Sequence, residues 1–339
     1  MVTLKQIASA VGVSSATVSR VLNFDATLSV TPQTRQSIIE TAEAMNYATP
    51  RHRQRMAPQQ APAKVALVHF LRPDQELADP YYVSLRLGIE SRCAALKLEV
   101  VKVYHTGAMP DPKLLQAASG VIAIGVHGDD EVAWLKRHSR HVVFADYAPR
   151  DDDIDSVESD RNLAMRKLLR ALTDLHYRRI GFVGWWDHSH PGGHEVWEDR
   201  AQVYATWMRD AGSFDEGLCQ LGTNTEQSGY DLTRAILAGP NRPDAIIAGN
   251  DNMAVGAYRA LHEQGLRIPD DIAIASFNDI SVAQFLNPPL STVRLPSEEI
   301  GETAVDLLME RMQGREIAKR SILASRLIWR GSTRLPQAD

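Results

Sequence analysis

The spacing of apolar residues changes once along this chain, near residue 64. Before that point apolar side chains recur every three or four residues, which is the period of one face of an α-helix. Beyond it, short continuous apolar runs alternate with longer segments of helical spacing. Such runs are typical of strands covered on both faces of a parallel sheet. The pattern predicts a helical head followed by an α/β body.

Three helices are predicted in the head. The first ends at Gly12, where a positive φ is easiest to adopt. Ser14 caps the second helix, and Thr31, which precedes a proline, caps the third. Ala8, Gly12 and Val18 suit a tight helix pair, since alanine permits a close crossing, glycine makes the turn and valine fills the angle. The sequence thus predicts a helix-turn-helix.

The outward face of the second helix is polar and carries Arg20. Residues 1–60 contain six basic and three acidic side chains, so this segment is +3; the whole chain is −5, which leaves −8 for the rest. A basic head on an acidic body indicates a polyanion as partner of the head. We expect the second helix to lie in a DNA major groove, where Arg20 can form two hydrogen bonds with a guanine. A plain helical hairpin packed on another domain is the alternative.

The body alternates strands and helices, which predicts parallel sheets with right-handed crossovers. Strands are expected at 65–71, 98–105, 120–125, 141–146, 179–184, 244–250 and 272–277. Helices are expected at 82–96, 160–175, 200–211, 227–237 and 252–264. We expect two sheets that divide near residue 160, with 291–294 and 327–329 completing one or the other.

Polar and aromatic residues gather after several of these strands, at the edge where parallel sheets bind ligands. They are Asp146, Trp185, Arg200, Asn250 and Asn278. Carboxylates, amides and an arginine can bind vicinal hydroxyls, and a tryptophan face suits the C–H side of a sugar. For Asp251 we favour a role as N-cap of the next helix. The sequence predicts a sugar site at this edge.

Metal and enzyme chemistry have little support in the sequence. One loop could supply metal ligands: Asp187, His188, His190, His194, Glu195 and Asp199. Its two glycines make a rigid site improbable, so an effector lid or a solvated loop is favoured. No nucleophile elbow or phosphate-binding loop is present, and the paired acids Asp129 and Asp130 are expected in a turn. We expect no enzyme activity, no cofactor and no metal.

The remaining composition favours a cytoplasmic protein. Cys93 and Cys219 are far apart and lack metal spacing, so both are interpreted as buried thiols in a reducing compartment. The chain begins without the apolar stretch of a signal peptide, and no run is long enough for a membrane span.

The chain resembles the LacI/GalR family of bacterial repressors in two stretches. The family's DNA-binding segment is similar to TLKQIASAVGVSSATVSRVLN, and its C-terminal signature is similar to NDNMAVGAYRALHEQGLRIPDD. The resemblance implies an α/β fold with a three-helix helix-turn-helix head and a periplasmic-binding-protein type I body of two doubly wound parallel-sheet subdomains. It implies a DNA-binding domain at 1–47, a hinge at 48–63 and an effector-binding and dimerisation domain at 64–339. The two subdomains would divide near 160, and the chain would recross near 290 and 322.

The resemblance also assigns residues by position. The base-reading residues are Ser15, Ala16 and Arg20. The phosphate contacts, which would fix register without reading sequence, are Thr3, Ser14, Thr17, Ser19, Asn23 and Thr31. In the hinge, Met56 would enter the minor groove beside Arg53, a flexible tether being the alternative. The effector-binding residues are Asp146, Arg200, Asn250 and Asn278, with Tyr81 and Tyr82 near the cleft mouth. Asn224 and Leu295 are expected where other members carry a tryptophan and an amide.

The function implied is a repressor of a sugar operon that binds a palindromic operator as a homodimer. DPYY and PPLSTVR resemble a repressor of a β-galactosidase operon, which implies a galactoside inducer bound between the subdomains. The alternative is a corepressor-activated regulator that responds to a purine or another sugar. Such a protein would be cytoplasmic and would reach the nucleoid through its DNA.

Overall fold

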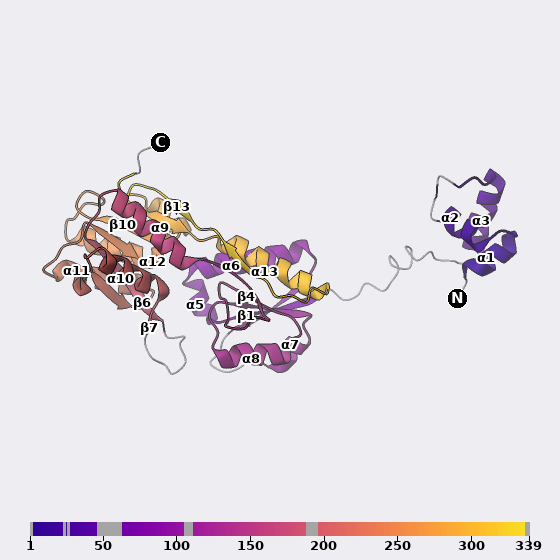
Figure 1. Cartoon of the computed structure of the whole chain (residues 1–339), viewed down its shortest axis with the longest axis horizontal. Helices are drawn as coiled ribbons and strands as arrows, with labels where there is room; N and C mark the ends of the chain where they lie inside the picture. Colours follow the sequence, from indigo (N-terminus) through magenta and orange to yellow (C-terminus); the bar gives the residue numbers. More distant parts are fainter. Residues whose placement is uncertain are drawn as a thin grey trace. The chain divides into compact units, whose positions relative to one another are not determined.

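The computed structural model describes residues 3–22, 25, 28–45, 63–104, 111–187 and 196–335 (Figure 1). The chain forms two compact units, the head within Met1–Pro62 and the body within Ala63–Asp339. No helix in the described ranges is long and apolar enough to cross a membrane.

The described part of the head consists of α1 (Leu4–Val11), α2 (Ser15–Leu22) and α3 (Pro32–Ala44). Gly12 ends α1 with a φ of 73°, and the backbone N–H of Thr17 donates to Oγ of Ser14 at 3.1 Å. Ile7, Val18 and Ile38, one from each helix, are fully buried against one another. The predicted helix-turn-helix is confirmed.

The first sheet of the body is parallel throughout, in the order β12-β5-β4-β3-β1-β2. Its strands are β1 (Lys64–His69), β2 (Glu99–Tyr104), β3 (Gly120–Ile124), β4 (Val142–Ala145), β5 (Asp155–Ser159) and β12 (Arg320–Leu323). Its helices are α5 (Pro73–Leu77), α6 (Pro80–Ala95), α7 (Pro112–Gln116), α8 (Asp129–His138) and α13 (Ser297–Met312). Alternate residues of β1 face two layers, because Leu67 packs with α6 and α13 whereas Val68 packs with α7 and α8. Figure 1 shows α6 and α13 on one side of this sheet and α7 and α8 on the other.

The second sheet has the order β13-β11-β10-β9-β6-β7, with β8 paired to β6. Its strands are β6 (Ile180–Asp187), β7 (Val196–Trp197), β8 (Cys219–Gly222), β9 (Ala245–Ala248), β10 (Ala273–Asn278), β11 (Ser291–Arg294) and β13 (Arg326–Ile328). Its helices are α9 (Arg161–Asp174), α10 (Asp199–Asp210), α11 (Glu226–Ala238) and α12 (Asp251–Glu263), with 3-10 turns at Glu216–Leu218 and Ser281–Phe285. The pairs α9/α10 and α11/α12 belong to separate apolar layers, so both faces are covered as predicted.

The chain passes between the two sheets after β5, after β11 and after β12. Each subdomain is therefore built from segments distant in sequence, and the two remain joined by three crossings. The predicted body of two parallel-sheet subdomains is confirmed.

Several local predictions were wrong. Asp129 and Asp130 begin α8 instead of lying in a turn, where their charges suit the helix N-terminus. Trp185 belongs to β6 itself, which extends further than its apolar run suggested. β5 was missed because its sequence, DSVES, is mostly polar, although Asp155 and Ser156 are buried. Cys219 is only partly buried, whereas Cys93 is buried as expected.

Two glycines let α6 and α13 cross closely. A Cβ on Gly88 would lie 2.3 Å from the backbone oxygen of Glu298, and one on Gly301 would lie 2.3 Å from that of Leu85. Only a residue without a side chain fits at either point. The crossing holds α13, which comes late in the chain, against α6, the helix that carries Tyr81 and Tyr82.

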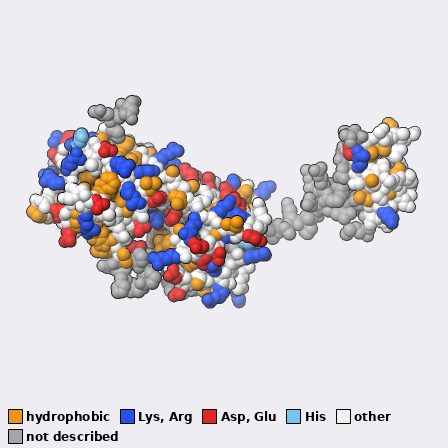
Figure 2. Space-filling model, viewed as in Figure 1, with side chains coloured by type: hydrophobic (Ala, Val, Ile, Leu, Met, Phe, Trp, Pro, Cys, Tyr) orange, Lys and Arg blue, Asp and Glu red, His pale blue; other side chains and the backbone are white. Residues whose placement is uncertain are grey.

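The surface of the body carries charges of both signs. On the face shown in Figure 2, acidic and basic side chains are interspersed among apolar ones. A mixed face of this kind does not attract a polyanion strongly.

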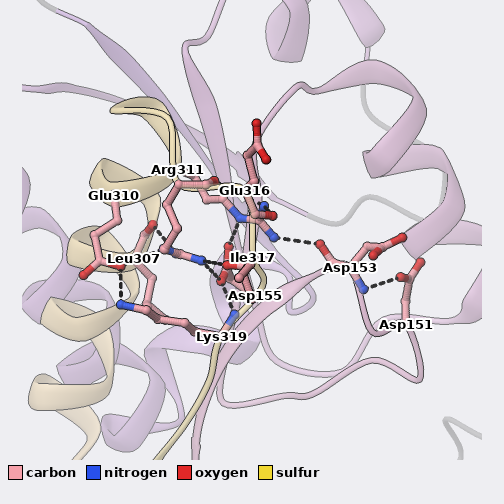
Figure 3. A network of polar contacts seen from close by, with 10 residues as sticks. Asp151, Asp153, Asp155, Leu307, Glu310, Arg311, Glu316, Ile317 and Lys319 are labelled. Atoms are coloured by element: carbon pink, nitrogen blue, oxygen red, sulfur yellow. Dashed lines mark hydrogen bonds and ion pairs between the residues drawn. The ribbon is translucent and has the colours of Figure 1, made fainter.

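A buried ion network ties the end of α13 to the first sheet (Figure 3). The carboxylate of Asp155, which is fully buried, accepts hydrogen bonds from Arg311, from Nη1 of Arg315 at 2.8 Å and from the backbone N–H of Lys319 at 2.6 Å. Arg311 also donates to the backbone oxygen of Asp153 at 2.9 Å. The network fixes the turn that leads into β12.

Candidate effector pocket and DNA-reading helix

A cavity of about 610 Å³ lies in the body at the carboxyl ends of strands from both sheets. All seven residues assigned to the effector site line it: Tyr81, Tyr82, Asp146, Trp185, Arg200, Asn250 and Asn278. Asn224 and Leu295 line it as well. The structure therefore brings together residues spread over more than two hundred positions of sequence.

The wall from the first subdomain centres on Asp146, which directly follows β4. Its side chain is buried and accepts hydrogen bonds from Oη of Tyr81 at 2.8 Å, Oη of Tyr82 at 3.1 Å and Nη1 of Arg161 at 3.1 Å. Burial, followed by the charge of Asp146, raises the pKa of both tyrosines, so both hydroxyls stay protonated. Asp146 is therefore held in a fixed position by three donors.

The wall from the second subdomain centres on Arg200, near the start of α10. Its Nε donates to both carboxylate oxygens of Glu198, at 3.0 and 3.1 Å, and its Nη1 donates to the carbonyl of Gly249 at 2.8 Å. The guanidinium lies 4.6 Å from the ring of Trp185 and 5.2 Å from that of Phe277. These contacts fix the plane of the guanidinium, and Glu198 balances its positive charge within the protein.

Two asparagines complete this side. Asn250 is the N-cap of α12, since its side chain accepts from the backbone N–H of Met253 at 2.8 Å, and its Nδ2 donates to the carbonyl of Asn224 at 3.2 Å. Asn278 ends β10 with a φ of 106°.

The prediction that Asp251 is the N-cap was wrong, because the preceding residue takes that place. Asp251 is fully buried, and its carboxylate accepts from the hydroxyls of Ser276 and Thr292 and from the backbone N–H of Ile280 at 2.8 Å. Burial raises its pKa to about 6. It fastens α12 to the ends of β10 and β11 behind the pocket.

Several lining residues were not predicted, among them Asp79, Arg161 and Glu198. Asp79 is the N-cap of α6 and accepts from the backbone N–H of Tyr81 at 3.1 Å. Burial, and to a lesser degree the nearby Asp146, raises its pKa to about 6. An aspartate directly before a proline and an apolar helix is a cap signal. That signal could have placed Asp79 at the cleft, next to the predicted tyrosines.

In the head, Ser15, Ala16 and Arg20 lie on the exposed face of α2. Nε of Arg20 forms an ion pair with Asp25 at 2.7 Å, although about half of the arginine side chain remains exposed. The arginine assigned to base reading is thus already paired with a carboxylate.

Three of the residues assigned to phosphate contacts are helix caps. Thr3 caps α1, Ser14 accepts from the third residue of α2, and Thr31 accepts from the backbone N–H of Thr34 at 3.2 Å. Helix N-termini favour anions, so the same positions suit DNA phosphates. Thr17 and Ser19 are half-buried on α2.

Other assigned residues lie outside the described ranges: Asn23, Arg53, Met56, His188, His190, His194 and Glu195. Among the described residues, no group of three or more metal-binding side chains is found.

Comparison with known proteins fits this geometry. Residues 3–50 match the model of the bacterial regulatory proteins of the lacI family, and residues 169–333 match that of a periplasmic binding protein-like domain. The HTH-type transcriptional regulator GalR of Lacticaseibacillus casei is 36% identical over 340 residues, covering 98% of this chain and 100% of that one. The chain belongs to the LacI family.

Two further similarities bear on this LacI-family protein. The lactose operon repressor of Rhizobium radiobacter is 57% identical over 113 residues, which are 33% of this chain and 100% of that sequence. A solved complex of the transcriptional regulator CelR with cellobiose has a TM-score of 0.69 and 26% identity, covering 98% of this chain and 100% of that one. The chain is a sugar-responsive transcriptional repressor, and these relatives are regulators, not enzymes.

Proposed function

We propose that this repressor binds a palindromic operator as a homodimer and releases it when a galactoside occupies the pocket of the body. The observation that supports the effector most directly is the cavity of about 610 Å³ in which Asp146, Arg200, Asn250 and Asn278 meet Trp185. Charged and amide groups suit the hydroxyls of a sugar, and an indole suits its apolar face. The similarity to a lactose operon repressor favours a galactoside, since lactose is one.

The two walls of the pocket belong to different subdomains, so a sugar that contacts both would favour their closure. Nδ2 of Asn252 on α12 already donates to the carbonyl of Ala78 at 3.1 Å, which places the two subdomains in contact beside Asp79. The sugar can shift the equilibrium only by its preference for the closed arrangement. Movement of the first subdomain would draw the attached head out of register with its groove.

On DNA, Ser15, Ala16 and Arg20 would read base edges while the capping threonines and serine contact phosphates. On binding, Arg20 would leave the carboxylate of Asp25 and form hydrogen bonds with a guanine instead. These new hydrogen bonds would offset the loss of the ion pair that the free head contains. A palindromic site needs two heads related by a two-fold axis, and the bodies would supply that dimer. The proposal keeps the boundaries 1–47, 48–63 and 64–339 and places the protein in the cytoplasm, on chromosomal DNA.

The experiment first selects a duplex from a random pool with the wild-type protein and then measures its affinity by fluorescence anisotropy. Arg20→Ala should weaken binding by about 1–3 kcal/mol and relax the preference at one base pair of each half-site. Lys5→Ala, on the exposed face of α1, is the matched control and should retain that preference. Failure to enrich any duplex over random competitor at moderate salt would contradict the proposed function.

A further inference from the structure

We propose that the pocket accepts uncharged or cationic sugars only, and that Asp79 and Asp199 exclude sugar phosphates and sugar carboxylates. The inference deepens the proposed function and rests on its assignment of this cavity to the effector. It follows from the excess of carboxylates over guanidinium groups among the described lining residues.

Both arginines of the pocket are neutralised inside the protein. Arg161 donates to Asp146 at 3.1 Å, and Arg200 donates to both oxygens of Glu198 at about 3 Å. Glu198 and Arg200 are buried, so this ion pair is shielded from solvent. A phosphate binds tightly where unpaired arginines or lysines converge on it. To recruit either arginine here, a phosphate would have to compete with a carboxylate that is already paired with it, and that buried carboxylate would lose its ionic partner while keeping only neutral donors.

Carboxylates remain after this pairing. Among the described residues, neither Asp79 nor Asp199 forms a salt bridge, although both line the pocket. Asp79 is engaged by the backbone N–H of Tyr81, which does not cancel its charge. Among the described residues that line the cavity, five carry carboxyl side chains and two carry guanidinium groups.

The excess of acidic over basic side chains is a feature of the pocket lining and is not seen on the face of the body in Figure 2. The body surface shown in Figure 2 mixes both signs, whereas the lining is dominated by one. Asp79 is half-buried, where like charges repel more strongly than in water, whereas Asp199 is exposed and its repulsion is more screened. An anionic group on the ligand is therefore repelled by Asp79 and Asp199, while hydroxyl groups still find donors and acceptors. A sugar ammonium would be attracted.

The test compares neutral and charged forms of the same sugars on the full-length protein. Binding of galactose, glucose and ribose is measured by calorimetry and by intrinsic tryptophan fluorescence, to which Trp185 in the lining contributes, against galactose 6-phosphate, glucose 6-phosphate, ribose 5-phosphate, galacturonate and galactosamine. For the neutral sugar that binds best, the phosphate should bind at least about 100-fold more weakly, and the ammonium form of galactose should bind no more weakly than galactose itself.

Asp79→Asn and Asp199→Asn identify the groups responsible. Asparagine at position 79 keeps the cap of α6, so thermal melts should show both variants folded. Asp79→Asn should reduce the discrimination against phosphate roughly tenfold, Asp199→Asn, whose carboxylate is exposed, should reduce it less, and the double variant should reduce it further than either. Asp130→Asn, on the exposed start of α8, is the matched control and should change nothing.

Phosphates that bind as tightly as their neutral sugars would overturn this inference and leave the proposed function standing. The same holds if the variants fold and discriminate as wild type does. If none of the three neutral sugars binds, both the proposed effector class and this inference are wrong. If glucose or ribose binds in place of galactose, the galactoside proposal fails, and the neutral and phosphorylated pair of that sugar still decides the charge question.

Discussion

Two buried aspartates of the first sheet, Asp146 directly after β4 and Asp155 at the start of the neighbouring β5, have different surroundings. Asp155 opens β5 at the amino edge, where two arginines and a backbone N–H occupy its carboxylate (Figure 3). Asp146 follows β4 at the carboxyl edge, where two tyrosine hydroxyls and one arginine hold it beside an open cavity. Both accept hydrogen bonds from arginine, so the difference between the structural carboxylate and the one that we propose contacts the effector lies in the edge of the sheet at which each is placed.

The largest expected effect is the loss of stability when Asp155 is replaced. Asp155→Ala leaves Arg311 and Arg315 without their buried partner, which should lower the free energy of unfolding by about 3–5 kcal/mol. Asp146→Asn preserves the shape of its side chain and should cost only about 1–2 kcal/mol. Urea denaturation followed by circular dichroism measures both. Asp152→Ala, whose side chain is almost fully exposed, is the control and should change stability by less than about 0.5 kcal/mol.

For sugar affinity, the substitution at Asp146 should have the larger effect and the substitution at Asp155 the smaller one. Where Asp155→Ala remains folded, its sugar affinity should match that of wild type, whereas Asp146→Asn should lose at least about tenfold in affinity. Equal losses of stability in the two variants, or an unchanged sugar affinity in Asp146→Asn, would contradict the division between the two carboxylates.

A smaller effect concerns Asp79, the carboxyl that lies between the two walls. Its pKa is raised to about 6 by burial, with Asp146 adding to the rise and Arg200 opposing it. Because the folded state holds this proton more tightly than the unfolded one, ionisation costs stability. The cost is absent below about pH 4, grows between about pH 4 and 6, and is constant above.

Asp79→Asn removes that cost and keeps the helix cap. Its melting temperature should equal that of wild type near pH 4 and exceed it by a few degrees at pH 8, as thermal melts across this range would show. Asp130→Asn serves again as the exposed control, with no pH-dependent difference. A variant less stable than wild type at pH 8 would show that the ionised carboxylate is stabilising.

The head was predictable from sequence because its design is local. Gly12, Ser14 and Thr31 make their turn and caps within a few residues, and α2 exposes Arg20 by its period alone. Within the described part of the head, the ion pair of Arg20 with Asp25, five residues away, was missed.

The pocket was predictable in part. Polar residues at the carboxyl ends of apolar strands marked Asp146, Asn250 and Asn278 correctly as lining residues. Their partners could not be found in this way, since Arg161 is distant in sequence from the tyrosines with which it shares Asp146. For Asp251 the cap rule chose the wrong one of two adjacent residues, because burial against Thr292 is set by a strand forty positions away.

The most direct measurement is anisotropy of the selected operator duplex with wild-type protein at moderate salt, titrated with lactose or galactose. The account predicts that saturating sugar weakens operator affinity at least about tenfold, while a scrambled duplex is bound weakly with or without it. Unchanged operator affinity with every galactoside, or affinity that rises when sugar is added, would contradict release by a galactoside held in this pocket.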